Sequence, residues 1–377
     1  MTDSAPVGAA VVDITPPAGL AMSGFAARTS PATGTHDRLS ARALRVGDAI
    51  VVTADTCGLH EDSCERIRRA VLASEPQVDG VVVAATHTHG GPAVVPGRLG
   101  GPVDPAYLRS LEQACVHAAR QAYAHARPAT VSFGIGRDPG VARNRRRPDG
   151  PTDPRLPVLT FRDETGRTIA IVTSYACHPV VLGADNTLWT ADYPGVVRRE
   201  LERTHPDAVA IFLTGCCGDA NTGHSASASM TLGASTNRTF PACERIGTAI
   251  AQAALETRPV PTTGPTGVRQ RQVALALADG TPWVGRVSVL DWVGVRLVAL
   301  PGEPFAATAL AIRSALPGPT VVIGYADGCP GYFPTREEYA FGGYEVEDAH
   351  RYYGMSSAFA PGSAERLRDA AIDLARS

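Results

Sequence analysis

Residues 80–92 read GVVVAATHTHGGP, and the predicted fold follows from this stretch. Its first six residues are glycine, valine and alanine, a composition typical of a strand that is buried on both faces. The run then changes at once to Thr86-His87-Thr88-His89, and glycines and a proline complete a turn. Such strands occur in sheets that are covered on both sides, and ligands collect at their carboxyl ends. We therefore predict an α/β sheet with a functional site that begins at this strand end.

Strand-like and helix-like segments alternate on both sides of this stretch. The expected strands are short apolar runs at residues 43–46, 49–53, 80–85, 129–133, 169–174, 209–213, 295–300 and 320–324. The expected helices carry polar and apolar residues at helical spacing, at residues 61–73, 105–126, 192–203, 243–257, 305–315 and 365–376. This alternation predicts an α/β fold in which helices cover the faces of a mixed sheet.

The composition limits the classes of function. The chain has 377 residues, of which 44% are hydrophobic and 19% are charged, so a large core is expected. Thirty-five basic and 37 acidic residues leave a net charge of −2, which gives no global field for nucleic acid or an anionic membrane. No lysine occurs, so every one of these basic residues is an arginine. Schiff-base chemistry, lysine general bases and a Walker-A phosphate site are thereby excluded.

The N-terminus and the cysteines bear on the compartment. The chain starts MTDSAP, without the basic and apolar segments of a secretory signal, and no apolar run approaches the roughly 20 residues of a membrane helix. Eight cysteines are scattered without a CxxC pair. The adjacent Cys216-Cys217 could form a redox or metal element, but we favour small core residues, because free cysteine packs as a small hydrophobe. We predict a cytoplasmic protein without membrane insertion.

Polar residues also follow other expected strands. His178-Pro179 comes after 169–174, Gly218-Asp219 after 209–213 and Glu303 after 295–300. Two histidines and one glutamate form the ligand set that leaves a catalytic zinc one open position, where the metal activates water and polarises a carbonyl. Spacing alone does not show which of His87 and His89 would bind the metal, because residues i and i+2 of an extended chain point to the same side. Each residue alone has an ordinary structural explanation, so only the joint pattern predicts a hydrolytic metal site.

Two irregular stretches leave alternatives open. Arg145, Arg146 and Arg147 form a basic cluster that suits either a solvated turn or, beside a cleft, an anionic substrate. Residues 223–239 are rich in Ser, Ala, Thr and Gly without periodicity, which suits either a lid over a site or a surface loop.

Several motifs together resemble a known family. They are residues 21–27 (AMSGFAA), 33–42 (TGTHDRLSAR), 86–92 (THTHGGP), Asn144-Arg145, His178-Pro179, Gly218-Asp219, 301–303 (PGE) and 332–344. Their order and approximate spacing resemble the catalytic domain of the neutral, non-lysosomal ceramidase family. The resemblance implies a zinc site held by His87, His178, Glu303 and Tyr332. It further implies that His89 faces the substrate carbonyl and that three residues lie near the scissile group: Gly24, Arg145 and Tyr344.

Three features depart from the family. Its Gly-Asp-x-Ser-Pro-Asn motif carries a catalytic serine, but the stretch here reads Gly218-Asp219-Ala220-Asn221, so Asn221 stands at the serine position. An amide can donate and accept hydrogen bonds but is neither a base nor a nucleophile. Family members are also longer, with a C-terminal β-sandwich domain, and are usually secreted. We expect residues 1–377 to form a single catalytic domain without that β-sandwich, and ceramide is not the expected substrate.

The sequence therefore predicts a zinc-dependent hydrolase that cleaves a linear amide (N-acyl) bond of a soluble small molecule. His89 and Tyr344 would stabilise the oxyanion or transfer protons, and Arg145 would orient the substrate. Asp219 would hold the neighbouring loop or orient a metal-bound histidine. One alternative is an esterase or lactonase that uses the same zinc site, and another is a non-catalytic, metal-holding pathway protein.

Overall fold

The computed structural model describes residues 4–232 and 237–377, and it contains two β-sheets packed face to face. The large sheet has the strand order β11-β9-β8-β6-β1-β3-β4-β5, and the short β13 also pairs with β6. Its strands are β1 (Ala5–Asp13), β3 (Ser40–Val46), β4 (Ala49–Ala54), β5 (Gly80–Ala85), β6 (Arg127–Gly136), β8 (Leu156–Asp163), β9 (Thr168–Tyr175), β11 (Val209–Thr214) and β13 (Val260–Pro261). The second sheet has the order β14-β15-β16-β18, formed by Thr266–Ala276, Pro282–Trp292, Val295–Ala299 and Thr320–Ile323.

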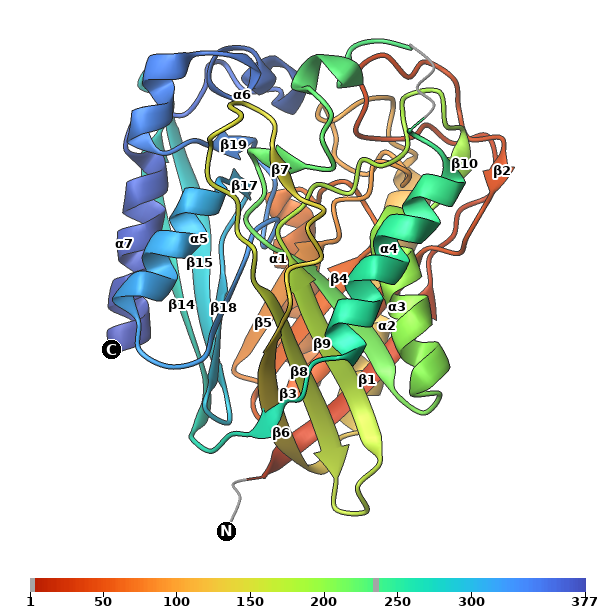
Figure 1. The fold of residues 1–377 in the computed structure, drawn as a ribbon, viewed down its shortest axis with the longest axis vertical. Coiled ribbons are helices and arrows are strands. Elements are labelled where there is room, and N and C mark those ends of the chain that lie inside the picture. The colour runs from red at the N-terminus through yellow and green to blue at the C-terminus, as the bar shows by residue number, and fades with distance from the viewer. Residues whose placement is uncertain (1–3, 233–236) are drawn as a thin grey trace.

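Helices cover the outer face of each sheet. The large sheet packs against α1 (Glu61–Ser74), α2 (Pro105–Ala124), α3 (Asp192–Thr204) and α4 (Phe240–Leu255). The second sheet packs against α5 (Ala306–Ala315) and α7 (Ser363–Arg376). Figure 1 shows the resulting order of layers: helices, large sheet, second sheet, helices. Because each sheet buries one face against helices and the other against the second sheet, most strand residues in the large sheet are buried.

Short strand pairs and turns lie beyond one end of the sheets, at the top of Figure 1. The pairs are β2 (Gly34–Thr35) with β10 (Leu188–Trp189), β7 (Arg143–Asn144) with β12 (Ala220–Asn221), and β17 (Glu303–Pro304) with β19 (Tyr332–Phe333). The short helices are η1 (Ala226–Ser229), η2 (Arg336–Phe341), α6 (Tyr344–Glu347) and η3 (Ala349–Tyr353). Isolated bridges from Ala84 to Ala326 and from Gly215 to Ile323 join the two sheets just below these segments.

The predicted α/β fold with helices flanking a mixed sheet is confirmed. The large sheet is mixed because it contains both pair types: β4 and β5 run parallel, whereas β3 and β4 run antiparallel. All six expected helices occur within a few residues of their expected bounds. The second sheet was not expected as a separate layer, and it occupies the face on which we expected further helices. Residues 233–236 of the irregular stretch 223–239 lie outside the described residues.

Candidate metal centre

Two histidines and a glutamate converge in the fully buried centre. His87 follows β5, His178 follows β9 and Glu303 begins β17, and all three side chains have no exposed surface. The Oε2 atom of Glu303 lies 3.3 Å from His87 Nε2 and 2.9 Å from His178 Nε2. One ligand atom from each residue therefore lies within 4.8 Å of the other two.

The backbone turns sharply at His87, whose φ of 66° is a left-handed value that a non-glycine residue adopts only where the surroundings enforce it. The chain there is not extended, contrary to our premise for the His-x-His pair. The rings of His87 and His89 nevertheless meet, with their Nε2 atoms 3.3 Å apart. Tyr325 stacks on His87 at a ring distance of 4.1 Å and fixes its plane.

Hydrogen bonds at the other ring nitrogens settle which nitrogen faces the centre. His87 Nδ1 lies 2.5 Å from the carbonyl oxygen of Cys57, and His178 Nδ1 lies 2.6 Å from that of Cys217. A nitrogen that donates to a carbonyl carries the proton, so each Nε2 presents a lone pair to the Glu303 carboxylate. Three acceptors that face one another require a proton or a cation between them, and the buried His178 Nε2 has no hydrogen-bond partner among the described residues. The donor set fits a zinc-type ion with an open coordination position.

Burial and neighbouring charges shift the pKa values of the three histidines around Glu303. Burial lowers the pKa of His87, but Glu303 and Cys57 together outweigh this effect and raise it to about 10. Burial, reinforced by the Arg145 guanidinium, lowers the pKa of His178 to about 4. The pKa of His89 lies well below its usual value, because the ring is buried beside two other histidines. A fully buried carboxylate thus demands one positive charge from its surroundings, which a bound metal ion would supply.

Tyrosines hold the glutamate in place. Tyr353 in η3 donates a hydrogen bond to Glu303 Oε1, and Tyr325 Oη lies 3.4 Å from Oε2. The pairing of β17 with β19 sets Tyr332 directly beside Glu303 in register. The Tyr332 ring lies nearly parallel to the His178 ring, at a distance of 6.4 Å. The structure therefore brings Tyr332 next to the three clustered candidate ligands.

A small cavity of about 50 Å³ opens beside these residues. His89, Gly24, Arg145, Tyr332 and Tyr344 all line it, so five of the residues predicted from the sequence share one wall. Gly24 has a φ of 100°, and a Cβ atom there would lie 2.5 Å from His89 Nδ1. That buried nitrogen has no hydrogen-bond partner among the described residues, and only a residue without a side chain fits against it.

The arginine cluster is neither a solvated turn nor a set of free cations. Arg145 Nε pairs with Glu345 at 2.7 Å, and its Nη2 donates to Tyr332 Oη at 2.9 Å. Arg146 bridges Glu338 and Glu345, at 3.0 and 2.7 Å. The third guanidinium, of Arg147, pairs with Glu338 at 3.0 Å. This network ties the strand β7 to η2 and α6, and only Arg145 reaches the cavity beside the histidines.

Asp219 and Asn221 act on the loops around the centre. The Asp219 carboxylate accepts hydrogen bonds from the backbone amide of Ala306, at the start of α5, and from the Asn144 side chain. Burial raises its pKa to about 7. The Asn221 amide accepts from the backbone amides of Gly223 and His224 and donates to the carbonyl of His224. Its polar atoms are therefore engaged by its own loop.

Sequence reasoning missed two tyrosines and one thiol. Tyr325 and Tyr353 contact Glu303, yet neither lies in a motif with recognisable spacing. Cys57 Sγ lies 3.7 Å from His87 Nδ1. All eight cysteines are buried and unpaired by disulfides, including Cys216 and Cys217. The only available signal for Tyr325 was its place directly after the apolar run 320–324.

A buried His-His-Glu set beside a cavity with a histidine, an arginine and tyrosines has the residue chemistry typical of metallohydrolase centres. The chain belongs to the family described as neutral/alkaline non-lysosomal ceramidase, N-terminal, whose pattern matches residues 6–278. Membership makes it a hydrolase that acts on a carbon–nitrogen bond other than a peptide bond.

Solved structures agree on the fold. The crystal structure of neutral ceramidase from Pseudomonas aeruginosa superposes with a TM-score of 0.82 at 19% identity, over 99% of this chain and 74% of that one. A ceramidase complexed with C2 gives 0.81 at 18% identity, over 99% and 75%. No protein of curated function gives a significant match.

Proposed function

We propose that this protein is a zinc-dependent hydrolase of a linear N-acyl amide bond in a soluble small molecule. The observation that carries the proposal is the convergence of two histidine lone pairs and a carboxylate beside the cavity that contains His89 and Tyr344. Neutral ceramidases are metal-dependent, and the three clustered side chains have the ligand chemistry for it.

Each residue has a definable task. His87, His178 and Glu303 would hold the ion, with Tyr332 beside them, and bound zinc supplies an activated water and a polarised carbonyl. His89 is neutral, because its pKa is lowered by burial and by the adjacent histidines, so its free Nδ1 can accept a proton and return it to the leaving nitrogen. Tyr344 keeps its proton, since burial raises its pKa, and can donate to the developing oxyanion.

The shape of the cavity supports a small substrate. About 50 Å³ beside the histidines accepts a group of a few non-hydrogen atoms, far below the roughly 300 Å³ at which drug-sized pockets begin. Asn221 also favours a substrate other than ceramide. By resemblance it stands at the position of the family's serine, and an amide is not a nucleophile. No helix in the described part of the chain has the length and apolar character that a membrane crossing requires.

The test combines metal content with a matched substrate panel. The purified protein should hold about one zinc per chain, by elemental analysis, and should hydrolyse short N-acyl amines faster than their ester analogues and faster than long-chain ceramide. His178→Ala should lose metal and activity together. An active preparation without metal would refute the zinc assignment, and equal turnover of ceramide and short N-acyl amines would refute the substrate assignment.

A further inference from the structure

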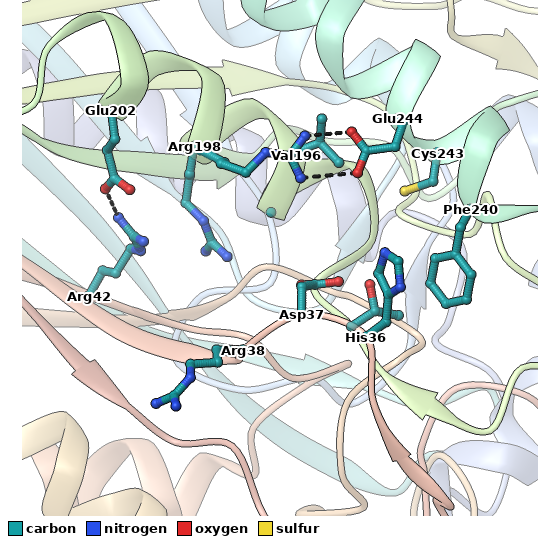
Figure 2. A pocket seen from close by; sticks show the side chains of 13 residues that line it. His36, Asp37, Arg38, Arg42, Val196, Arg198, Glu202, Phe240, Cys243 and Glu244 are labelled. Atoms are coloured by element: carbon teal, nitrogen blue, oxygen red, sulfur yellow. Dashed lines mark hydrogen bonds and ion pairs between the residues drawn. The ribbon is translucent and has the colours of Figure 1, made fainter.

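A second cavity lies on the outer side of the large sheet, between α3, the start of α4 and residues 36–42. Its volume is about 160 Å³, larger than that of the cavity beside the histidines. None of the residues that line it lines the first cavity. Figure 2 shows charged side chains entering it from three sides, with Arg198 between Arg42 and Asp37.

Two buried arginines form the charged wall of this cavity. Arg198 is 3% exposed, and both of its Nη atoms pair with Asp55, at 2.7 and 2.8 Å. Its Nε is buried and has no hydrogen-bond partner among the described residues, although the side chain lines the cavity. A buried, unpaired N–H of a guanidinium costs free energy that an acceptor in the cavity would recover.

The second arginine, Arg42, is also a largely buried cation that lines the cavity. It is 9% exposed, and it donates to Ser40 Oγ at 3.0 Å, to the Ala210 carbonyl at 2.7 Å and to Glu202. Burial lowers the pKa of Arg42, and the nearby Arg198 cation lowers it further. The two like charges repel each other; Asp55 and Glu202 offset part of this repulsion, and an anion near both guanidiniums would offset more of it.

The opposite wall limits where an anion can lie. The Asp37 carboxylate accepts a hydrogen bond from the backbone amide of Ala191 at 2.9 Å, and burial raises its pKa. Arg199 is neutralised by two contacts to Glu244, and Arg38 extends into solvent and pairs with Asp13. The donor left for an anion is therefore the unpaired Nε of Arg198, on the side of the cavity where Arg42 also lies.

We propose that this cavity binds a small oxyanion, a carboxylate or phosphate group, between Arg42 and Arg198, and that its occupancy alters the loop that carries His87 and His89. The loop contacts the cavity wall directly. Thr190, a lining residue, donates its backbone amide to the Gly90 carbonyl at 3.0 Å and accepts from Thr88 Oγ1 at 2.8 Å.

A second connection runs through the Arg198 partner. Asp55 accepts from Thr86 Oγ1 at 3.1 Å, and Thr86 immediately precedes His87. An oxyanion that accepts a hydrogen bond from the Arg198 guanidinium would change the strength of the ion pair between Arg198 and Asp55. The two chains of hydrogen bonds thus reach both sides of His87 and His89, and binding at one site must change affinity at the other by the same factor in each direction.

Binding is tested by calorimetric titration of the metal-loaded protein with inorganic phosphate and with acetate, against chloride at matched ionic strength. Arg42→Gln removes a cation and should weaken binding about tenfold, the effect of one charge-assisted hydrogen bond. Glu202→Gln removes the competing anion and should tighten binding severalfold. Arg269→Gln, which removes a comparably paired arginine on the second sheet, is the control and should leave binding unchanged.

The opposite signs at positions 42 and 202 separate this site from anion binding at the metal itself, which neither substitution should affect. Glu202 is partly exposed, and glutamine keeps an oxygen that can accept from the Ala210 amide, so Glu202→Gln remains informative where Arg42→Gln fails to fold. No binding of either anion, or equal affinities of wild type and Glu202→Gln, would refute the site. The preferred anion shows whether a carboxylate or a phosphate is the natural ligand.

Linkage is measured as the rate of zinc transfer to a chelator at increasing anion concentration. The rate should change, and the half-maximal concentration should increase from Glu202→Gln through wild type to Arg42→Gln. Zinc transfer that is independent of both anions would refute the connection to the His87 loop.

Discussion

Gly24→Ala tests whether the position of His89 determines the reaction rate. A Cβ at residue 24 would lie 2.4 Å from His89 Cγ, whereas ordinary contact begins at 3.4 Å. The His89 ring would therefore have to move by about 1 Å, and a displacement of about 1 Å at a reacting group can reduce the rate roughly 100-fold. The residue also has a φ of 100°, which strains any side chain and costs about 1–2 kcal/mol of stability.

Gly97→Ala separates the two effects. Gly97 has a φ of 72°, and a Cβ there would have no neighbour within 4 Å, so that substitution adds backbone strain without touching the site. Gly24→Ala should lose at least as much stability as Gly97→Ala in thermal unfolding, because it adds a clash to the backbone strain. Only Gly24→Ala should lose kcat on an N-acyl substrate, with zinc content unchanged. Equal kcat in the two variants would mean that His89 takes no part in the reaction.

Three further changes probe the surroundings of the centre. Tyr353→Phe removes the hydrogen bond to Glu303 Oε1 and should weaken zinc binding roughly 10- to 100-fold in chelator competition, while Tyr339→Phe, which loses only a bond to the Phe359 carbonyl, should not. Asn221→Ala removes three hydrogen bonds from residues 223–224 and should lower kcat at full zinc content; unchanged kinetics would place Asn221 outside the machinery. Burial raises the pKa of Asp192 to about 6, so its charge opposes folding: stability should fall as the pH rises from about 4 through 6, and this slope, followed by urea titration, should be absent in Asp192→Asn.

Several strands could be predicted because burial left a clear apolar pattern, although the largely buried strands β1 and β8 were not expected. The run 80–85 is buried at every residue and matches β5 at both ends. The pair β14 and β15 was missed because its residues are mixed in exposure: β14 reads TGVRQRQVALA, in which four consecutive polar residues, 269–272, occupy the middle of the strand. Such a hairpin is stabilised by its long register and by α7 packed on it, which are tertiary features. The short apolar strands β16 and β18 were expected, but nothing in them shows that they belong to a separate sheet.

The residues of the centre could be predicted as a set, but their geometry could not. A strand followed by His-x-His indicates a site, yet the left-handed backbone at His87 depends on the packing of Tyr325 and on the Cys57 carbonyl. Those contacts place His87 on Glu303 and leave His89 facing Gly24. For the arginine cluster, the charges were evident from the sequence but their ion-pair partners were not. These partners, Glu338 and Glu345, lie about 190–200 residues further along the chain.

The ligand set is a product of how the two sheets pack. His87 and His178 follow strands of the large sheet, whereas Glu303 follows β16 of the second sheet. Neither sheet alone brings a carboxylate to the two imidazoles, and the bridge from Ala84 to Ala326 fixes the distance between the two contributions. The backbone carbonyls at Cys57 and Cys217 orient the rings before any ion arrives. The energetic cost of burying the Glu303 charge is thus met by sheet packing, and a metal ion bound there would recover that cost as affinity.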